Sequence, residues 1–296
     1  MLLLPFLVLI SGCTGSPCIP LLCNQPIDEG SDIVVIKGLD AIPSEIAPGQ
    51  QVKIVGYIEN RGGSEIARLE AEIFDYCKGL FEIVDGNDGK KQIDKLLGRE
   101  TRIVSWILRA KGDIALQTTC PSDGVKMKVT YSYTTSSITN IEFIAAVEMQ
   151  RREEEGRFKE VSSTLTLGEG PLKPVVTIED KQPVSTDSGI TVISFQIKNH
   201  GDGFPTEATI DASKITFKEN ENAVLNIGAA LTQCKGDAET GWGEIRLIQK
   251  ASPKFFCKVE IPNGDYPIQF TEDIQASLDY QYEFRKSVTV TVKPKI

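Results

Sequence analysis

The sequence predicts an all-β protein of two tandem immunoglobulin-like β-sandwiches, with one short helix near residues 144–156. Short runs in which apolar and polar residues alternate recur from Ile33 onward, and clusters of Gly, Pro, Asn and Asp separate them. Half-buried strands of a two-layer sandwich produce this pattern. The second half of the chain also repeats features of the first half, so two similar β units are expected.

The first sandwich is assigned to residues 33–168. Its alternating runs read IVVIKGL, QVKIVGYIEN, ARLEAEIFDY, RIVSWILRA and VKMKVTYSY. The stretch Phe143–Phe158 interrupts this rhythm with helix-forming residues, which favours a short helix over the charged tip of a long hairpin. Val161–Leu167 returns to strand character and should close the domain.

A linker is expected at residues 169–174. The segment Gly168–Pro174 holds two glycines and two prolines, a composition typical of a short and partly flexible connection. The second sandwich then covers residues 175–296.

The repeat is clearest at a turn. PSEIAPGQQVKIVGYIENRGG (Pro43–Gly63) corresponds to PVSTDSGITVISFQIKNHGDG (Pro183–Gly203), and both contain an Ile-x-Asn-x-Gly sequence. We expect Asn60 and Asn199 to lie in turns that need a left-handed or otherwise tight backbone, which Asn and Gly adopt cheaply.

A second match is a Tyr-x-Tyr pair in each half, at Tyr131 and Tyr133 and at Tyr280 and Tyr282. The two rings of each pair should lie on one face of a strand. There they can cover a core edge, or a phenol can bond a neighbouring loop as in a tyrosine corner. The alternative is a set of surface tyrosines.

The chain contains seven cysteines. Each half has two of them before its Tyr-x-Tyr pair, which predicts one disulfide per domain. Cys18 and Cys23 are close enough in sequence to close a small loop, and Cys13 is then the odd thiol. The predicted disulfide cysteines are Cys77, Cys120, Cys234, Cys257, Cys18 and Cys23.

The amino terminus predicts export. Residues 1–12 include the apolar run MLLLPFLVLI, which is too short for a membrane-spanning helix but suits a secretion signal. Ile10-Ser11-Gly12-Cys13 resembles a lipobox, so Cys13 is the predicted lipidation site and residues 13–32 form a spacer. An ordinary signal cleaved nearby is the alternative. We expect an extracellular protein, anchored at the cell surface.

Composition argues against several classes of function. The net charge of −9 argues against nucleic acid as a partner, because phosphate binding needs clustered Lys and Arg. One histidine, His200, is present, and phosphate-loop, nucleophile-elbow and zinc-protease motifs are missing from the sequence. We expect no enzyme activity, no cofactor and no metal.

The strand pattern resembles the cell-adhesion-related domain of bacteria and archaea, CARDB. The matching residues are Pro48-Gly49, Val52-x-Ile54, Ile58-x-Asn60-x-Gly62-Gly63, Leu97-Gly98-Arg99-Glu100, Val104-x-Trp106-x-Leu108-x-Ala110 and Tyr131-x-Tyr133. The resemblance covers about 100 residues of the first domain and is loose between Lys214 and Lys254. It implies an immunoglobulin-like repeat in an exported surface protein. The lipobox, paired cysteines and Tyr-x-Tyr pairs also resemble archaeal secreted proteins.

Three functions are therefore considered. The first is a non-enzymatic surface or adhesion lipoprotein that contacts other surface proteins or copies of itself. The second is a filament subunit assembled by strand complementation, with Cys18–Asp32 or Ser287–Val292 as the donor. The third is a carbohydrate-binding accessory module, in which Trp242, between two glycines, would be an exposed contact residue.

Overall fold

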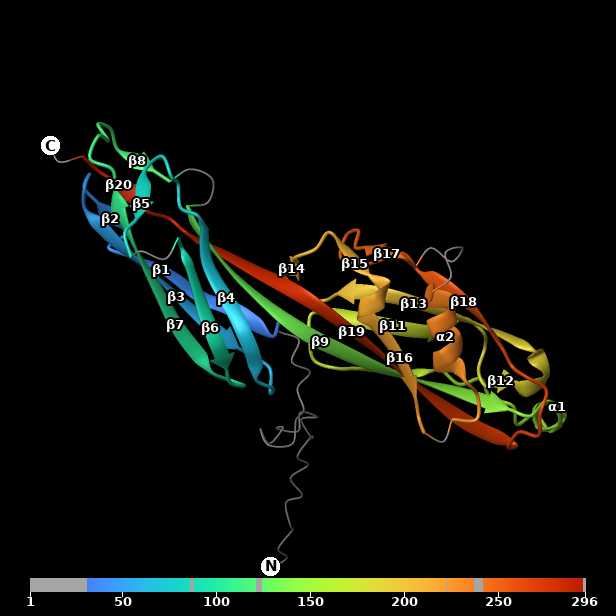
Figure 1. Cartoon of the computed structure of the whole chain (residues 1–296). Helices are drawn as coiled ribbons and strands as arrows, with labels where there is room; N and C mark the ends of the chain where they lie inside the picture. Colours follow the sequence, from blue (N-terminus) through green and yellow to red (C-terminus); the bar gives the residue numbers. More distant parts are fainter. Residues whose placement is uncertain (1–30, 86–87, 121–123, 222, 237–241, 295–296) are drawn as a thin grey trace, which may run out of the picture.

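The computed structural model describes residues 31–85, 88–120, 124–221, 223–236 and 242–294, and most of them are in β-strands (Figure 1). This confirms the predicted all-β class. The strands gather into two lobes joined by a narrow waist, and two long strands run through both lobes.

The first lobe is a two-layer β-sandwich. One sheet has the order β1-β3-β7-β5, and the facing sheet contains β19-β9-β4-β6. A Cβ placed on Gly56 would lie 2.5 Å from the Met127 sulfur, so this glycine lets the two layers approach closely. The strands that begin and end in this lobe are β1 (Val34–Ile42), β2 (Glu45–Ile46), β3 (Gln51–Asn60), β4 (Ile66–Asp75), β5 (Phe81–Ile83), β6 (Lys90–Leu96), β7 (Thr101–Ala110) and β8 (Thr118–Thr119).

The second lobe places a sheet of order β11-β13-β18 against the other halves of the two long strands. The hydroxyls of Ser137 and Thr139 donate to the carbonyls of Pro174 and Val176 and so join the layers. The elements of this lobe are α1 (Ala146–Glu154), β10 (Thr164–Leu167), β11 (Leu172–Ile178), β12 (Val184–Ser185), η1 (Thr186–Ser188), β13 (Ile190–Asn199), β14 (Phe204–Pro205), β15 (Thr209–Asp211), η2 (Ala212–Lys214), β16 (Ile215–Glu219), α2 (Ile227–Gly236), β17 (Glu244–Arg246) and β18 (Phe255–Glu260).

The long strands β9 (Val125–Ile144) and β19 (Gln269–Val288) connect the lobes (Figure 1). They pair antiparallel along their whole length, from Val125 opposite Val288 to Ile144 opposite Gln269. β9 starts beside β4 in the first lobe and ends beside β10 and β12 in the second. β19 runs the opposite way, so each half of the chain extends its last long strand from its own lobe into the lobe of the other half.

The chain ends in the first lobe. β20 (Thr291–Val292) pairs with β2 and β8, which lie far earlier in the sequence. The strand pairing therefore differs from two consecutive domains at 33–168 and 175–296. A division along the chain would cut through both lobes.

The segment expected to be a linker, residues 169–174, is packed inside the waist. Gly170 and Pro171 are buried, and Leu172 begins β11. Even Lys173 is buried, and its ammonium group donates to the carbonyl of Gly168. The glycines and prolines serve close packing here and not flexibility.

The helix expected near residues 144–156 is confirmed by α1, which has no buried residues and lies at the far end of the second lobe (Figure 1). The short strands that follow Pro43 and Pro183 confirm the repeat. β2 pairs in parallel with β20, and β12 pairs in parallel with the end of β9. The two halves of the chain are thus related by an approximate twofold arrangement.

Candidate functional site

The two Tyr-x-Tyr pairs meet at the centre of the waist. Tyr131 lies opposite Tyr282, and Tyr133 lies opposite Tyr280, with the Ser132–Gln281 pair between them. Ring centroids are 6.0 Å apart in the first pair and 6.3 Å in the second, both in edge-to-face geometry. Cross-strand aromatic pairs of this kind stabilise antiparallel strands. The repeated motif therefore joins the two halves.

The hydroxyls of Tyr280 and Tyr282 are held inside the protein. Tyr280 shares a hydrogen bond of 2.8 Å with Thr135, and Tyr282 donates to Oδ1 of Asn199 at 3.0 Å. Burial raises the pKa of both phenols, and the nearby Asp32 carboxylate raises the pKa of Tyr282 further. Both phenols stay neutral and act as hydrogen-bonding groups.

Asn60 organises its turn through its side chain. The amide nitrogen donates to the carbonyls of Ser64 (2.8 Å), Leu96 (3.2 Å) and Leu97 (3.1 Å), while Oδ1 accepts from the Gly62 N–H at 3.0 Å. All of the asparagine's polar atoms are used, and its side chain is fully buried.

Asn199 repeats the arrangement. Its amide donates to the Gly203 carbonyl at 2.9 Å, and Oδ1 accepts from the Gly201 N–H at 3.0 Å. Both expected tight turns are present, and their backbone is not left-handed, since Asn60 and Asn199 and the glycines that follow them have no positive φ. Gly201 is needed because a Cβ there would overlap the Asp32 carboxylate and the Tyr282 hydroxyl.

Two carboxylates cross-link the halves at the waist. Asp32 precedes β1 and accepts from the Asp202 N–H at 2.8 Å, in the turn of the second half. Glu169 precedes β11 and accepts from the Gly63 N–H at 3.2 Å, in the turn of the first half. We call this reciprocal pair, Asp32 and Glu169, the carboxylate clasp. Asp32 is 4% exposed, so the chain enters the described fold at a buried point in the waist.

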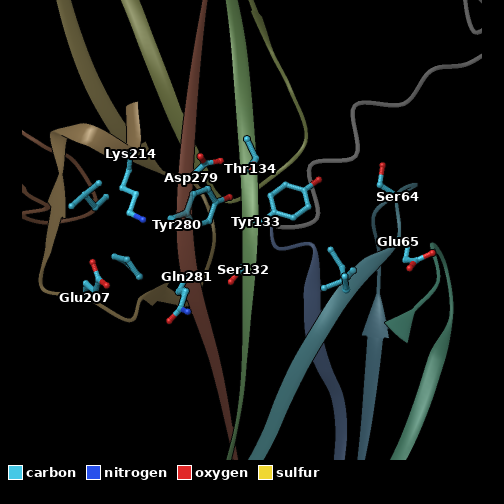
Figure 2. Close-up of a pocket in the computed structure, with 14 residues that line it drawn as sticks. Ser64, Glu65, Ser132, Tyr133, Thr134, Glu207, Lys214, Asp279, Tyr280 and Gln281 are labelled. Carbon is cyan, nitrogen blue, oxygen red and sulfur yellow. Dashed lines mark hydrogen bonds between the residues drawn. The ribbon is translucent and has the colours of Figure 1, made fainter. Parts of the chain in front are cut away.

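A groove crosses the waist beside the tyrosines (Figure 2). β9 and β19 form its floor, Glu65 lies on the side of the first lobe, and Glu207 and Lys214 lie on the side of the second. Thr134 donates to Asp279 within it at 2.5 Å. The groove offers hydrogen-bonding and charged groups to a polar partner, and His200 does not line it.

The disulfides predicted for the two halves are present. Cys77 is bonded to Cys120 with Cα atoms 5.8 Å apart, and Cys234 is bonded to Cys257 with Cα atoms 5.9 Å apart. One bridge lies in each lobe. Cys13, Cys18 and Cys23 lie outside the described residues, so lipidation and the small loop remain predictions.

The expectation that Trp242 is an exposed contact residue is wrong. Its side chain is 0% exposed and packs against Phe195, Phe217 and Phe255, with ring centroids 5.3, 6.0 and 5.5 Å away. These three rings come from three different strands. The prediction considered only the two glycines beside Trp242, which carry no information about those strands.

His200 lies in the turn after Asn199, as its place in the repeat suggests. Its backbone N–H donates to the Pro171 carbonyl at 2.8 Å. Burial, together with the positive charges of Lys173, Lys198 and Lys250, lowers the pKa of its imidazole. The imidazole is therefore mainly neutral at pH 7.

Sequence reasoning missed the carboxylate clasp. The available signal was an acidic residue two or three positions before the first strand of each half, at Asp32 and Glu169. Its meaning depends on the crossing of β9 and β19, which places each carboxylate beside the other half's turn.

Among the described residues, no cluster of His, Cys, Asp and Glu could hold a metal ion. Within the same ranges, no helix is long and apolar enough to cross a membrane. No protein-family model matches the chain, and no curated protein is significantly similar to it.

Proposed function

We propose that the protein is a non-enzymatic, exported surface protein, anchored through Cys13, that presents its two lobes to other surface proteins or to copies of itself. The observation that carries this proposal is the position of Asp32, which is buried in the waist and bonded to the second half of the chain. An anchor before this point would attach the molecule on the side where the chain enters the first lobe and the waist, and would leave the end of the second lobe free.

The two disulfides support export. Structural disulfides persist in oxidising compartments and are rare in the cytosol. Each lobe has one, and Cys120 and Cys257 are buried within the lobe cores.

The tether length fits a surface anchor. The eighteen residues from Cys13 to Gly30 could extend over at most about 60 Å. A tether within this limit would let the lobes turn toward partners while the molecule stays anchored.

The outer sheet of the first lobe offers one contact surface. Ile42 of β1 and Ile107 of β7 flank Lys53 of β3 in one row of the sheet, and Ile103 lies further along β7 with 61% of its surface exposed. Exposed apolar side chains gathered on one face are typical of protein contact surfaces.

The other two functions gain less support. Val290 and Val292, in the proposed donor Ser287–Val292, are fully buried in the chain's own first lobe, so donating this segment would require opening that lobe. The burial of Trp242 removes the aromatic platform expected of a carbohydrate-binding module.

The proposal is tested by comparing Cys13→Ala with a matched control, the double variant Cys18→Ala, Cys23→Ala. We expect the natural chain and the control to fractionate with membranes, enter the detergent phase and carry a lipid by intact mass. Cys13→Ala should be released in soluble form. Membrane retention of Cys13→Ala would contradict the anchor, and heat-resistant ladders of the extracted protein would favour the filament subunit.

A further inference from the structure

The outer edges of the two long strands can be compared position by position. The edge of β9 that faces away from β19 is paired at three places. β4 covers its start, β10 covers residues 137–140, and β12 pairs in parallel with Phe143 and Ile144. The outer edge of β9 is therefore covered in both lobes, while residues 132–136 in the waist have no second partner among the described strands.

The outer edge of β19 follows the same plan with one omission. β16 covers residues 274–278 near its start, and β2 pairs in parallel with β20 just after its end. Between them, β14 pairs only with Tyr282 and Glu283. Within the described ranges, no strand pairs with the outer edge of Phe284–Val288, which we call the open edge.

A surface hollow lies beside the open edge and is rich in positive charge. Its cationic residues are Lys37 of β1, Arg61 just after β3, and Arg285 and Lys286 of β19. Lys37 and Arg61 pair with Glu59, and Arg285 pairs with Glu283. Lys286 donates to the carbonyls of Ile36 and Lys37 and has no ion pair with a described carboxylate. Two carboxylates, Asp202 and Asp32, also line the hollow, and Asp32 is one residue after the start of the described chain. The hollow is suited to an extended segment that carries negative charge.

The second half of the chain identifies such a segment. Val34 pairs with Asn60 and Leu172 pairs with Asn199, so Val34 and Leu172 are equivalent first residues of their strands and lie 138 residues apart. The two asparagines lie 139 residues apart, and the offset of the strand starts, which directly follow the segment of interest, is used here. By this offset, β10 corresponds to residues 26–29, and Gly168 corresponds to Gly30. The residues that would precede β1 in the repeat are therefore Pro26-Ile27-Asp28-Glu29.

We propose that residues 26–29 occupy the open edge of β19 as an antiparallel strand, the counterpart of β10, and complete the first lobe. The Tyr-x-Tyr pairs set an offset of 149 residues between β9 and β19, from Tyr131 to Tyr280. Leu165 pairs with Thr139, so Ile27 lies opposite Val288. Leu167 pairs with Ser137, so Glu29 lies opposite Lys286.

Charge and backbone chemistry agree with this register. Glu29 lies opposite Lys286, and Asp28 lies opposite Ser287 and diagonal to Arg285; both cationic side chains are exposed in the described structure. In the second half, a Cβ on Gly168 would lie 2.5 Å from the Ser136 carbonyl oxygen. A glycine at the corresponding position 30 meets the same requirement. The pairing would also remove an exposed strand edge, which is otherwise prone to association with other chains.

The test is a cysteine pair in the full mature chain, with Cys18→Ser and Cys23→Ser to prevent exchange. The variant Ile27→Cys, Val288→Cys places two thiols at directly opposed positions. The control Ile27→Cys, Ser287→Cys places the second thiol on the other face of the strand. We expect an intrachain disulfide in the first variant, formed at least about tenfold faster than in the control, because successive strand residues face opposite sides.

Each outcome decides the proposal. Equal rates in the two variants would overturn it, and an interchain disulfide would assign the segment to a second copy instead. Hydrogen exchange gives a check that needs no new cysteine. Removing residues 13–29 should speed exchange of the outward amides of Phe284–Val288 at least about tenfold, while those of residues 275–278, paired with β16, stay unchanged. No change at the open edge would overturn the proposal even if Cys13 is lipidated.

Discussion

At the scale of single residues, Glu272 is a buried carboxylate whose surroundings disfavour its negative charge. It is 3% exposed and accepts from the N–H groups of Val224 (2.6 Å) and Leu225 (3.0 Å). Burial raises the pKa of its carboxyl, and the nearby charges of Glu219 and Asp273 raise it further, although the two N–H donors oppose this. The folded state therefore binds a proton more readily than the unfolded state.

The substitution Glu272→Gln should stabilise the protein at neutral pH. Because the folded-state pKa is raised, the natural chain loses stability as pH rises from the unfolded pKa, near 4.3, through the folded one. Glutamine keeps an oxygen for the two N–H donors and carries no charge. Urea unfolding at pH 4 and pH 7 should show that the advantage of the variant grows with pH.

The control for this comparison is Glu153→Gln on the exposed α1 helix, where a similar loss of charge should change stability little at either pH. An advantage for Glu272→Gln that is the same at pH 4 and pH 7 would contradict the role assigned to the carboxylate charge.

At the scale of elements, we expect β20 to stabilise the first lobe, where its strand partners lie far earlier in the sequence. Val292 is fully buried, and its strand pairs with β2 and β8. Val292→Ala should cost about 2 kcal/mol of unfolding free energy, through lost burial and a small cavity. Hydrogen exchange should quicken in β2 and β8 and remain unchanged in the second-lobe sheet of β11, β13 and β18.

The exposed Val147 on α1 provides the matched control, since Val147→Ala removes the same atoms at a site with 81% exposure. Its effect should be close to zero. Faster exchange confined to the second lobe in Val292→Ala would show that the C-terminal strand belongs there instead.

The sequence could predict elements better than their partners. Alternation places the correct faces of β3 and β7 in the core, because burial of every second residue is a local pattern. Cysteine parity likewise predicted both bridges. The sequence pattern could not show that β9 and β19 pair with each other, because periodicity specifies which face of a strand is buried and not which strand lies beside it.

One local signal did carry information about the crossing. Strand-like residues continue for 20 positions in both β9 and β19, which corresponds to about 66 Å of strand. Strands are usually shorter than 10 residues, so such a length implies that a strand leaves one sandwich and enters another. The burial of Trp242 could not be predicted in this way, because no local signal reports it. The side chains around Trp242 come from strands that are distant in the sequence.

At the scale of the whole molecule, the crossing predicts that the two halves of the chain form one unit. A protease site inserted between Lys159 and Glu160 would lie in an exposed segment after α1. Cleavage there would give two fragments, and each described disulfide would lie within one fragment. Noncovalent contacts alone would then hold the halves together.

We expect the cleaved fragments to elute as one particle of unchanged mass in size-exclusion chromatography, because β9 and β19 remain paired along 20 positions and β20 still closes the first lobe. The melting temperature of the cut protein should rise with protein concentration, since unfolding now separates two chains, whereas that of the uncut control should not. Two consecutive, independent domains would instead elute as separate particles of about half the mass, each with a concentration-independent transition. That result would contradict the exchanged strands, the carboxylate clasp and the completed first lobe together, because all three require β19 to return across the waist.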